Sequence, residues 1–236
     1  MSVDNSFDDI RPYNDAEVRP VIDRLLQDPE LIEAIGQYKN PWLKKILGRG
    51  YNVILQKCMA QKLRGVADVH SWQMFIAEYM RYMIGSSITE LTYSGLDCLS
   101  ADKAYLFISN HRDIVLDPAL VNYGLYLHNL PTVRIAIGDN LLQKPYVADL
   151  MRLNKSFIVK RSVTGVRERM KVYMDLSSYI DQSVHGGHNI WIAQREGRAK
   201  DGIDITDVAI MKMLYMCKKN LVRRLLTTSI ACILCL

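Results

Sequence analysis

The segment SNHRDIVLD, residues 109–117, places one histidine and two aspartates directly after an apolar run that is typical of a buried strand. Because free histidine titrates near neutral pH, His111 can take a proton from a hydroxyl group that acts as a nucleophile. A carboxylate at the second ring nitrogen would fix the tautomer and stabilise the imidazolium, and both Asp113 and Asp117 are candidates. The alternative is a surface histidine that lies beside a helix cap.

A basic pair follows another predicted strand, SFIVKR at residues 156–161. Side chains alternate along a strand, so only one of Lys160 and Arg161 need face a given site. The alternative is a solvated strand end.

The run REGR, residues 195–198, follows a third predicted strand. Gly197 permits a sharp turn and a close approach of substrate. Arg198, together with Arg195 or Lys200, can hold a phosphate group, while Glu196 can bind an acceptor or orient an arginine. The alternative is an ordinary charged turn.

These clusters need a scaffold, and the second part of the chain supplies an alternation of strands and helices. Predicted strands lie at 88–95, 103–110, 132–139, 156–161 and 189–195. Predicted helices lie at 117–128, 145–153, 163–180 and 207–220. This order predicts a layered α/β domain whose mixed, partly parallel sheet is flanked by helices. Strand ends in such sheets are the usual place for ligands.

A helical, basic segment is expected before this domain, over residues 1–84, with the α/β domain at 85–236. The chain has no acidic residue between Glu33 and Asp68, whereas lysines and arginines alternate there with Trp42 and aliphatic residues. This composition is typical of a helix that docks on a membrane surface. The alternative is a helix that packs on its own domain and leaves its lysines solvated.

The three clusters, in this order, resemble the PlsC-like lysophospholipid and glycerolipid acyltransferase family (1-acylglycerol-3-phosphate acyltransferase-like), over roughly residues 88–207. The first family block is a histidine and an aspartate with four residues between them. Here five residues separate His111 from Asp117, and the Leu-Asp pair before a helix favours Asp117 over Asp113. The third block normally has a threonine after Glu-Gly, but here Arg198 follows Gly197 directly. No counterpart of a fourth family block is found. A C-terminal truncation of a family member would give this pattern.

The resemblance implies transfer of a fatty acyl group from an acyl thioester, on coenzyme A or acyl carrier protein, to a hydroxyl of a lysophospholipid or glycerol-phosphate-like acceptor. It implies that His111 and Asp117 are catalytic. Its expected substrate-binding residues are Arg161, Arg195, Glu196, Gly197 and Arg198. Neither a metal nor a further cofactor is expected. A different class of function is a catalytically impaired, lipid-surface-binding protein with the same fold.

Composition and motifs bear on compartment and partners. The chain has 236 residues, a net charge of +5 and five irregularly spaced cysteines, which favours a reducing compartment. The N-terminal residues contain no apolar secretory signal, and the apolar run 225–236 is too short to span a bilayer. We therefore expect a cytoplasmic protein associated peripherally with the inner face of the membrane. The basic run at 39–64 carries no nucleic-acid recognition motif, so no nucleic-acid partner is expected.

Overall fold

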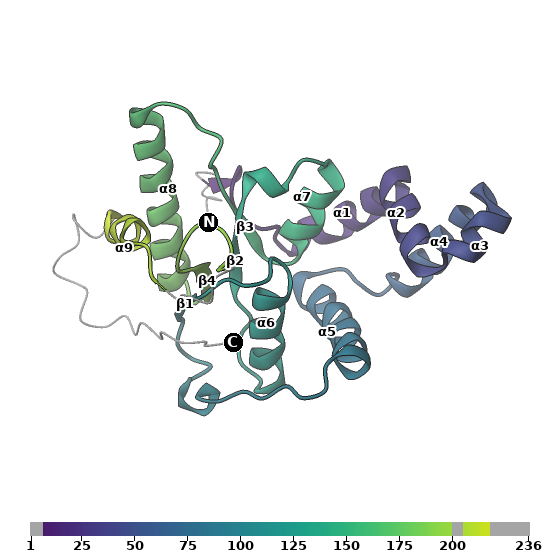
Figure 1. The fold of residues 1–236 in the computed structure, drawn as a ribbon, viewed down its shortest axis with the longest axis horizontal. Helices are drawn as coiled ribbons and strands as arrows, with labels where there is room; N and C mark the ends of the chain where they lie inside the picture. The colour runs from purple at the N-terminus through teal and green to yellow at the C-terminus, as the bar shows by residue number, and fades with distance from the viewer. Residues whose placement is uncertain (1–6, 200–204, 218–236) are drawn as a thin grey trace. The chain divides into compact units, whose positions relative to one another are not determined.

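The computed structural model describes residues 7–199 and 205–217, which form two compact units (Figure 1). The first unit comprises Met1–Arg11, Tyr79–Leu141 and Ser156–Leu236, and the second comprises Pro12–Glu78 and Leu142–Lys155. Lys200, the end of the helix expected at 207–220 and the apolar run at 225–236 lie outside the described residues.

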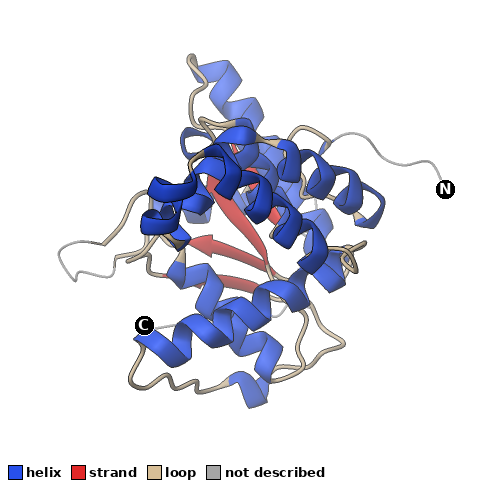
Figure 2. Cartoon of the chain, turned by 90° about the vertical axis from the view of Figure 1, so that its right-hand side faces the viewer, coloured by secondary structure: helices blue, strands red, loops and turns tan. Residues whose placement is uncertain are grey.

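The first unit is built on a sheet of four strands. They are β1 (Leu106–Ser109), β2 (Arg134–Gly138), β3 (Ser156–Val159) and β4 (Ile190–Ala193). The strand order is β1-β4-β2-β3, and every pair among them is parallel. Figure 2 shows these strands side by side, in red. The predicted α/β class is therefore confirmed, and the described sheet is wholly parallel. Ser109 pairs with Ala193 and Gly138 with Val159, so the strands end along one edge.

Helices cover both faces of this sheet: α6 (Leu116–Leu127) on one side, and α8 (Val166–His185) and α9 (Val208–Tyr215) on the other. The division follows from the two-residue period of the strands. Phe107 and Trp191 point into the core with α6, whereas their neighbours Ile108 and Ile190 point into the core with α8. Strands buried on both faces explain the continuous apolar runs that predicted them.

The prediction of a strand at 88–95 is wrong. Residues 88–95 are irregular and lead into a short 3-10 helix, η2 (Leu96–Cys98). Tyr93 lies against Gly124 of α6, and its hydroxyl donates a hydrogen bond to the carbonyl oxygen of Leu120 at 2.8 Å. The alternation in the sequence reflects this one-sided packing on a helix and not the pairing of a strand.

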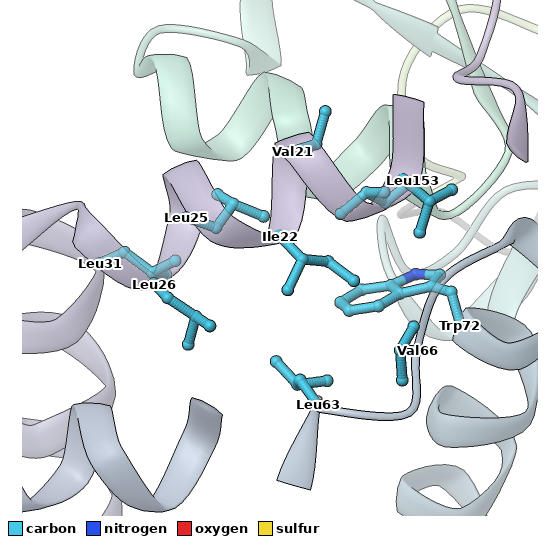
Figure 3. Packing of buried hydrophobic residues seen from close by; sticks show 10 residues of the cluster. Val21, Ile22, Leu25, Leu26, Leu31, Leu63, Val66, Trp72 and Leu153 are labelled. Atoms are coloured by element: carbon cyan, nitrogen blue, oxygen red, sulfur yellow. The ribbon is translucent and has the colours of Figure 1, made fainter. Parts of the chain in front are cut away.

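The second unit is helical, and its helices are α1 (Asp15–Gln27), α2 (Pro29–Lys39), α3 (Pro41–Leu47), α4 (Arg49–Lys62), the first part of α5 (Val69–Ser87), and α7 (Pro145–Leu153). Asp28 caps α2 by accepting a hydrogen bond from the amide of Leu31 at 2.9 Å. The hydrophobic core of the second unit includes Trp72, whose ring lies among Ile22, Val66 and Leu153 (Figure 3). Leu153 comes from α7, so this core joins distant parts of the chain. Over the residues described, no helix is both long and apolar enough to cross a membrane.

Candidate active site

The carboxyl ends of all four strands carry the polar residues of the candidate site. His111 follows β1, Asp139 follows β2, Arg161 follows β3, and residues 194–198 follow β4. Because the strands are parallel, these segments lie along the same edge of the sheet, where ligands bind in α/β folds.

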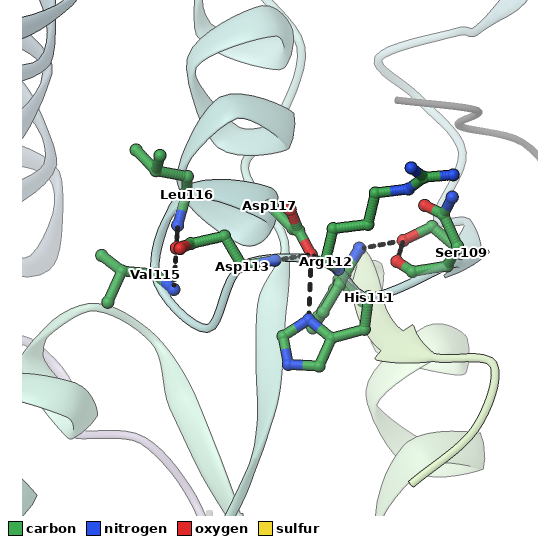
Figure 4. A network of polar contacts seen from close by, with 9 residues as sticks. Ser109, His111, Arg112, Asp113, Val115, Leu116 and Asp117 are labelled. Carbon is green, nitrogen blue, oxygen red and sulfur yellow. Dashed lines mark hydrogen bonds and ion pairs between the residues drawn. The ribbon is translucent and has the colours of Figure 1, made fainter. Parts of the chain in front are cut away.

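His111 and Asp117 form a hydrogen-bonded pair at this edge. Nδ1 of His111 lies 2.9 Å from Oδ2 of Asp117, and both side chains are largely buried (Figure 4). The same carboxylate oxygen accepts hydrogen bonds from the backbone amides of Arg112 at 2.7 Å and Asp113 at 3.0 Å. An oxygen that accepts from two amides is an acceptor toward the ring as well. Nδ1 of His111 is therefore the donor, and Nε2 is left as the basic nitrogen.

Asp113 has a different structural role. Its Oδ1 accepts hydrogen bonds from the amides of Val115 at 2.9 Å and Leu116 at 2.8 Å, which closes the turn that leads into α6. The hydrogen bonds from these two amides are the largest causes that lower the pKa of the Asp113 carboxyl, and the positive charge of Arg198 lowers it further. Of the two carboxylates considered from the sequence, Asp117 is therefore the one that holds His111.

Two buried side chains lie behind the histidine. The His111 ring packs edge-to-face on Trp191 of β4, with a centroid distance of 5.8 Å. Nε1 of Trp191 in turn donates to the hydroxyl of Ser109 at 3.0 Å. The backbone adds a further contact, since the amide of Ala199 donates to the carbonyl of His111 at 2.6 Å. The imidazole is thus supported from β1, β4 and the loop after β4.

Arg161 and Glu196, from the ends of β3 and β4, form an ion pair with a distance of 3.2 Å between Nη1 and Oε1. Both side chains are exposed, so the other guanidinium donors can reach a ligand. The neighbouring Lys160 instead pairs with Asp9. The alternation expected for these two basic residues is thus visible in their different partners.

Asp139, which the sequence did not single out, fixes the start of the Arg161 segment. Its carboxylate accepts hydrogen bonds from the amide of Arg161 at 3.0 Å and from the amide and hydroxyl of Ser162. Burial raises the pKa of Asp139, but these hydrogen bonds outweigh it and the pKa is lowered. Gly138 lies beside this segment, and a Cβ there would collide with Oδ1 of Asn140 and would lie 3.1 Å from Nε of Arg161. The sequence feature that could have identified Asp139 as a site residue was its position at the end of a predicted strand.

The loop after β4 brings the remaining predicted residues to the same edge. Gly197 has a φ of +74°, a conformation that favours glycine. Arg198 is exposed and close enough to lower the pKa of Asp113, whereas Arg195 is partly buried. This loop therefore lies between the two pairs: Glu196 contacts Arg161, and Ala199 contacts the His111 backbone.

The arrangement has the chemical parts for moving a proton beside a bound anion. Nε2 of His111 can accept a proton from a hydroxyl, and the Asp117 carboxylate can stabilise the imidazolium that forms. Arg161 and Arg198 supply positive charge along the same edge. Planar guanidinium groups suit phosphate oxygens.

A comparison with protein families identifies the family of the chain. The model of the family described as Acyltransferase matches residues 90–230, which is more than half of the chain. The matched part includes the whole sheet and every residue of the candidate site. A search among curated proteins finds no match. The chain belongs to the PlsC-type acyltransferase family.

Proposed function

We propose that the chain transfers a fatty acyl group from an acyl thioester to a hydroxyl of a lysophospholipid or glycerol-phosphate-like acceptor, with His111 as the general base. The observation that carries the proposal is the hydrogen bond between His111 and Asp117, which leaves Nε2 as the basic nitrogen. The donor is an acyl chain on coenzyme A or on acyl carrier protein. No metal or further cofactor is needed for this step.

The transfer follows from ordinary acyl chemistry. Nε2 of His111 takes the hydroxyl proton as the acceptor oxygen attacks the thioester carbonyl carbon. The tetrahedral adduct collapses, the carbon–sulfur bond breaks, and the leaving thiolate takes the proton back from the imidazolium. Asp117 stabilises the transient positive charge on His111 throughout. No covalent acyl-enzyme forms, so the hydroxyl of Ser109 is left to its structural contact with Trp191.

We assign the acceptor phosphate to the basic side chains beside this pair. Arg161 and Arg198, with Arg195 behind them, can bind phosphate oxygens, and Glu196 orients Arg161 through their ion pair. Gly197 lets the loop turn toward the acceptor. The family's usual threonine is missing here, and the direct Gly197-Arg198 step places the guanidinium one residue earlier.

Three departures from the family pattern favour the alternative, a binding protein without activity: the extra residue between His111 and Asp117, the missing threonine and the fourth block that is not found. Despite the extra residue, Asp117 lies 2.9 Å from His111 across the turn that Asp113 closes. This geometry favours a transferase over a protein that only binds lipid.

The test uses the purified chain with labelled acyl-coenzyme A or acyl-carrier protein and 1-acylglycerol 3-phosphate. Wild-type protein should form labelled diacyl product, and His111→Ala should lose the transfer while keeping its thermal unfolding transition. Asp113→Asn is the matched control, because it changes a neighbouring carboxylate that does not contact the imidazole. Full turnover by His111→Ala would refute the role of His111. Vesicle binding without transfer from either donor would favour the inactive alternative.

We further propose that the second unit docks on the inner face of the membrane through α3 and α4. Trp42 is 69% exposed, and Ile46, Leu47, Val53 and Ile54 are exposed as well. Lys45, Arg49 and Lys57 are exposed on the same two helices. Apolar side chains between basic ones suit the boundary of an anionic bilayer. We call these residues the α3–α4 surface.

Vesicle sedimentation tests this docking. Trp42→Glu/Ile46→Glu should weaken binding to vesicles that contain phosphatidylglycerol. Glu78→Gln, a change outside the α3–α4 surface, should bind like wild type. Equal binding of the double variant and wild-type protein would exclude the α3–α4 surface from docking.

A further inference from the structure

The first half of α8 is an unusual piece of helix in the first unit. From Val166 to Asp175 every residue except Val172 is exposed, whereas the second half packs on the sheet through Leu176 and Ile180. Figure 1 shows the corresponding turns of α8 extending past the strands. Short helices without tertiary packing are marginal in water, so ten such residues call for a partner.

These turns have a continuous apolar face. The α8 face, as we call it, comprises Val166, Met170, Tyr173 and Met174, which are 74%, 55%, 44% and 39% exposed. Their spacing of three and four residues places them on one side of the helix. An exposed cluster of large apolar side chains at this spacing marks an interaction site.

The charges around the α8 face indicate the partner. With about 100° of rotation per residue, Arg167 and Arg169 lie on the two borders of the face and Lys171 lies just behind Arg167. Glu168 and Asp175 lie on the opposite side of the helix. An apolar strip bordered by arginines suits a surface that is apolar within and anionic at its boundary, because long basic side chains can reach the headgroups.

The position of α8 relates a bilayer contact at the α8 face to the candidate active site. Val166 comes five residues after Arg161, so the first turns of α8 lie beyond the edge of the sheet that carries His111 (Figure 1). A bilayer against the α8 face would therefore lie beside that edge. A lysophospholipid could then pass from the bilayer to the site over a short path.

We infer that the α8 face inserts into the headgroup boundary of a bilayer that contains anionic phospholipid, as a contact separate from the α3–α4 surface. The inference goes beyond the proposed reaction, because it concerns binding alone. Experiments without an acyl donor test it, so their outcome does not depend on whether His111 catalyses transfer.

Vesicle sedimentation with two charge-changing variants is the first test. Met170→Glu/Tyr173→Glu should weaken partitioning into mixed phosphatidylcholine and phosphatidylglycerol vesicles by about tenfold or more, since the apolar contact is lost and negative charge is added. Leu127→Glu is the matched control: Leu127 is 49% exposed, but it ends α6 at the opposite edge of the sheet. The control should bind like wild type. The same comparison in a Trp42→Glu/Ile46→Glu background separates the α8 face from the α3–α4 surface.

Substitutions of Arg167 and Arg169 test the charge contribution while the apolar side chains of the α8 face stay unchanged. Each of Arg167→Gln and Arg169→Gln should weaken binding to the anionic vesicles by about fivefold, the value of one basic residue near such a surface. Binding to vesicles of phosphatidylcholine alone should change little. This pair also serves if the glutamate variants fail to fold, because both arginines are exposed.

Fluorescence gives an independent readout. In Tyr173→Trp/Trp42→Phe protein the new indole is the single exposed one, since Trp72 and Trp191 are buried. Its emission should shift to the blue on addition of the anionic vesicles. An unshifted emission, together with α8 variants that bind vesicles like wild type, would overturn the inference. A wild-type dimer that Met170→Glu/Tyr173→Glu converts to monomer, with vesicle binding unchanged, would assign the α8 face to a second copy instead.

Discussion

Oδ2 of Asp117 lies 2.9 Å from Nδ1 of His111, although five residues separate the two in sequence, one more than in the usual family block. Between them, Oδ1 of Asp113 accepts hydrogen bonds that close the turn before α6. The backbone amides of Arg112 and Asp113 point at the same carboxylate oxygen of Asp117. The contact is therefore set by the turn and not by the number of residues in it.

Asp117→Asn should lower kcat by about 10²–10⁴-fold with a smaller change in KM. The amide nitrogen of asparagine can donate to Nδ1 of His111, which would leave the ring proton on Nε2, where the base is needed. Steady-state kinetics of acyl transfer would measure the loss. A kcat within a factor of a few of wild type would show that Asp117 does not orient the base.

Asp113→Ala should act on stability more than on chemistry. It removes the acceptor for the amides of Val115 and Leu116, and losing such a cap costs about 1 kcal/mol. Urea unfolding would show the loss, and kcat should fall much less than in Asp117→Asn. A larger catalytic defect than in the Asp117 variant would reverse the assignment of the two carboxylates.

Asp139→Ala should raise KM for a phosphorylated acceptor by about tenfold, the effect of losing hydrogen bonds to a charged group. The reason is indirect: Asp139 holds the backbone of Arg161 and Ser162, and Arg161 faces Glu196. Arg161→Ala should show at least the same rise. In the double variant the two effects should not add, because both act through one side chain. Additive effects would mean that Asp139 acts elsewhere.

Asp149→Asn should destabilise the second unit by about 1–3 kcal/mol near neutral pH. Arg24 donates to both oxygens of this carboxylate, at 2.8 and 2.9 Å, and the Tyr13 hydroxyl donates at 2.6 Å. Burial raises the pKa of Asp149, but these contacts outweigh it and the pKa is lowered.

The stabilisation that Asp149 provides depends on pH. Because the folded pKa of Asp149 lies below its unfolded value, the stabilisation is present above about pH 4 and is lost as the pH falls through the folded pKa. Urea unfolding between pH 7 and pH 3 should therefore show a stability difference between wild type and Asp149→Asn that shrinks toward acid. A constant difference over that range would contradict the linkage.

Gly124→Ala should destabilise the first unit by about 1–3 kcal/mol, because its Cβ would lie 2.4 Å from Cε1 of Tyr93. Gly85→Ala is the control, since Gly85 lies inside helix α5 and a Cβ there meets nothing within 4 Å. That control should be neutral or stabilising by up to about 1 kcal/mol. Thermal unfolding of both variants would measure the difference.

The sequence was sufficient for much of the α/β unit because strong local signals agree there. Apolar runs marked the four observed strands. The segment 88–95 misled because a helix-packed loop and an edge strand share the same alternation. The assignment of α7 to the second unit depends on packing between distant segments, which no local pattern encodes.

The candidate site divides in the same way. His111 and Asp117 were visible because they lie six positions apart and flank a helix start. Asp139 contacts a segment more than twenty residues away, and only the sheet brings the two together. At Gly138 a Cβ would meet a local atom, Oδ1 of Asn140, and also the Arg161 side chain, and only the second contact depends on the sheet.

The divided chain path of the second unit has a consequence for how the protein is made. Trp72 of α5 packs with Leu153 of α7, and Arg24 binds Asp149, which lies 125 positions later. At a synthesis rate of about 5–20 residues per second, the N-terminal helices leave the ribosome roughly ten seconds before α7 exists. During that interval their apolar faces lack a partner. A nascent chain arrested before residue 145 should therefore be a preferred client of chaperones, and release should follow the emergence of α7.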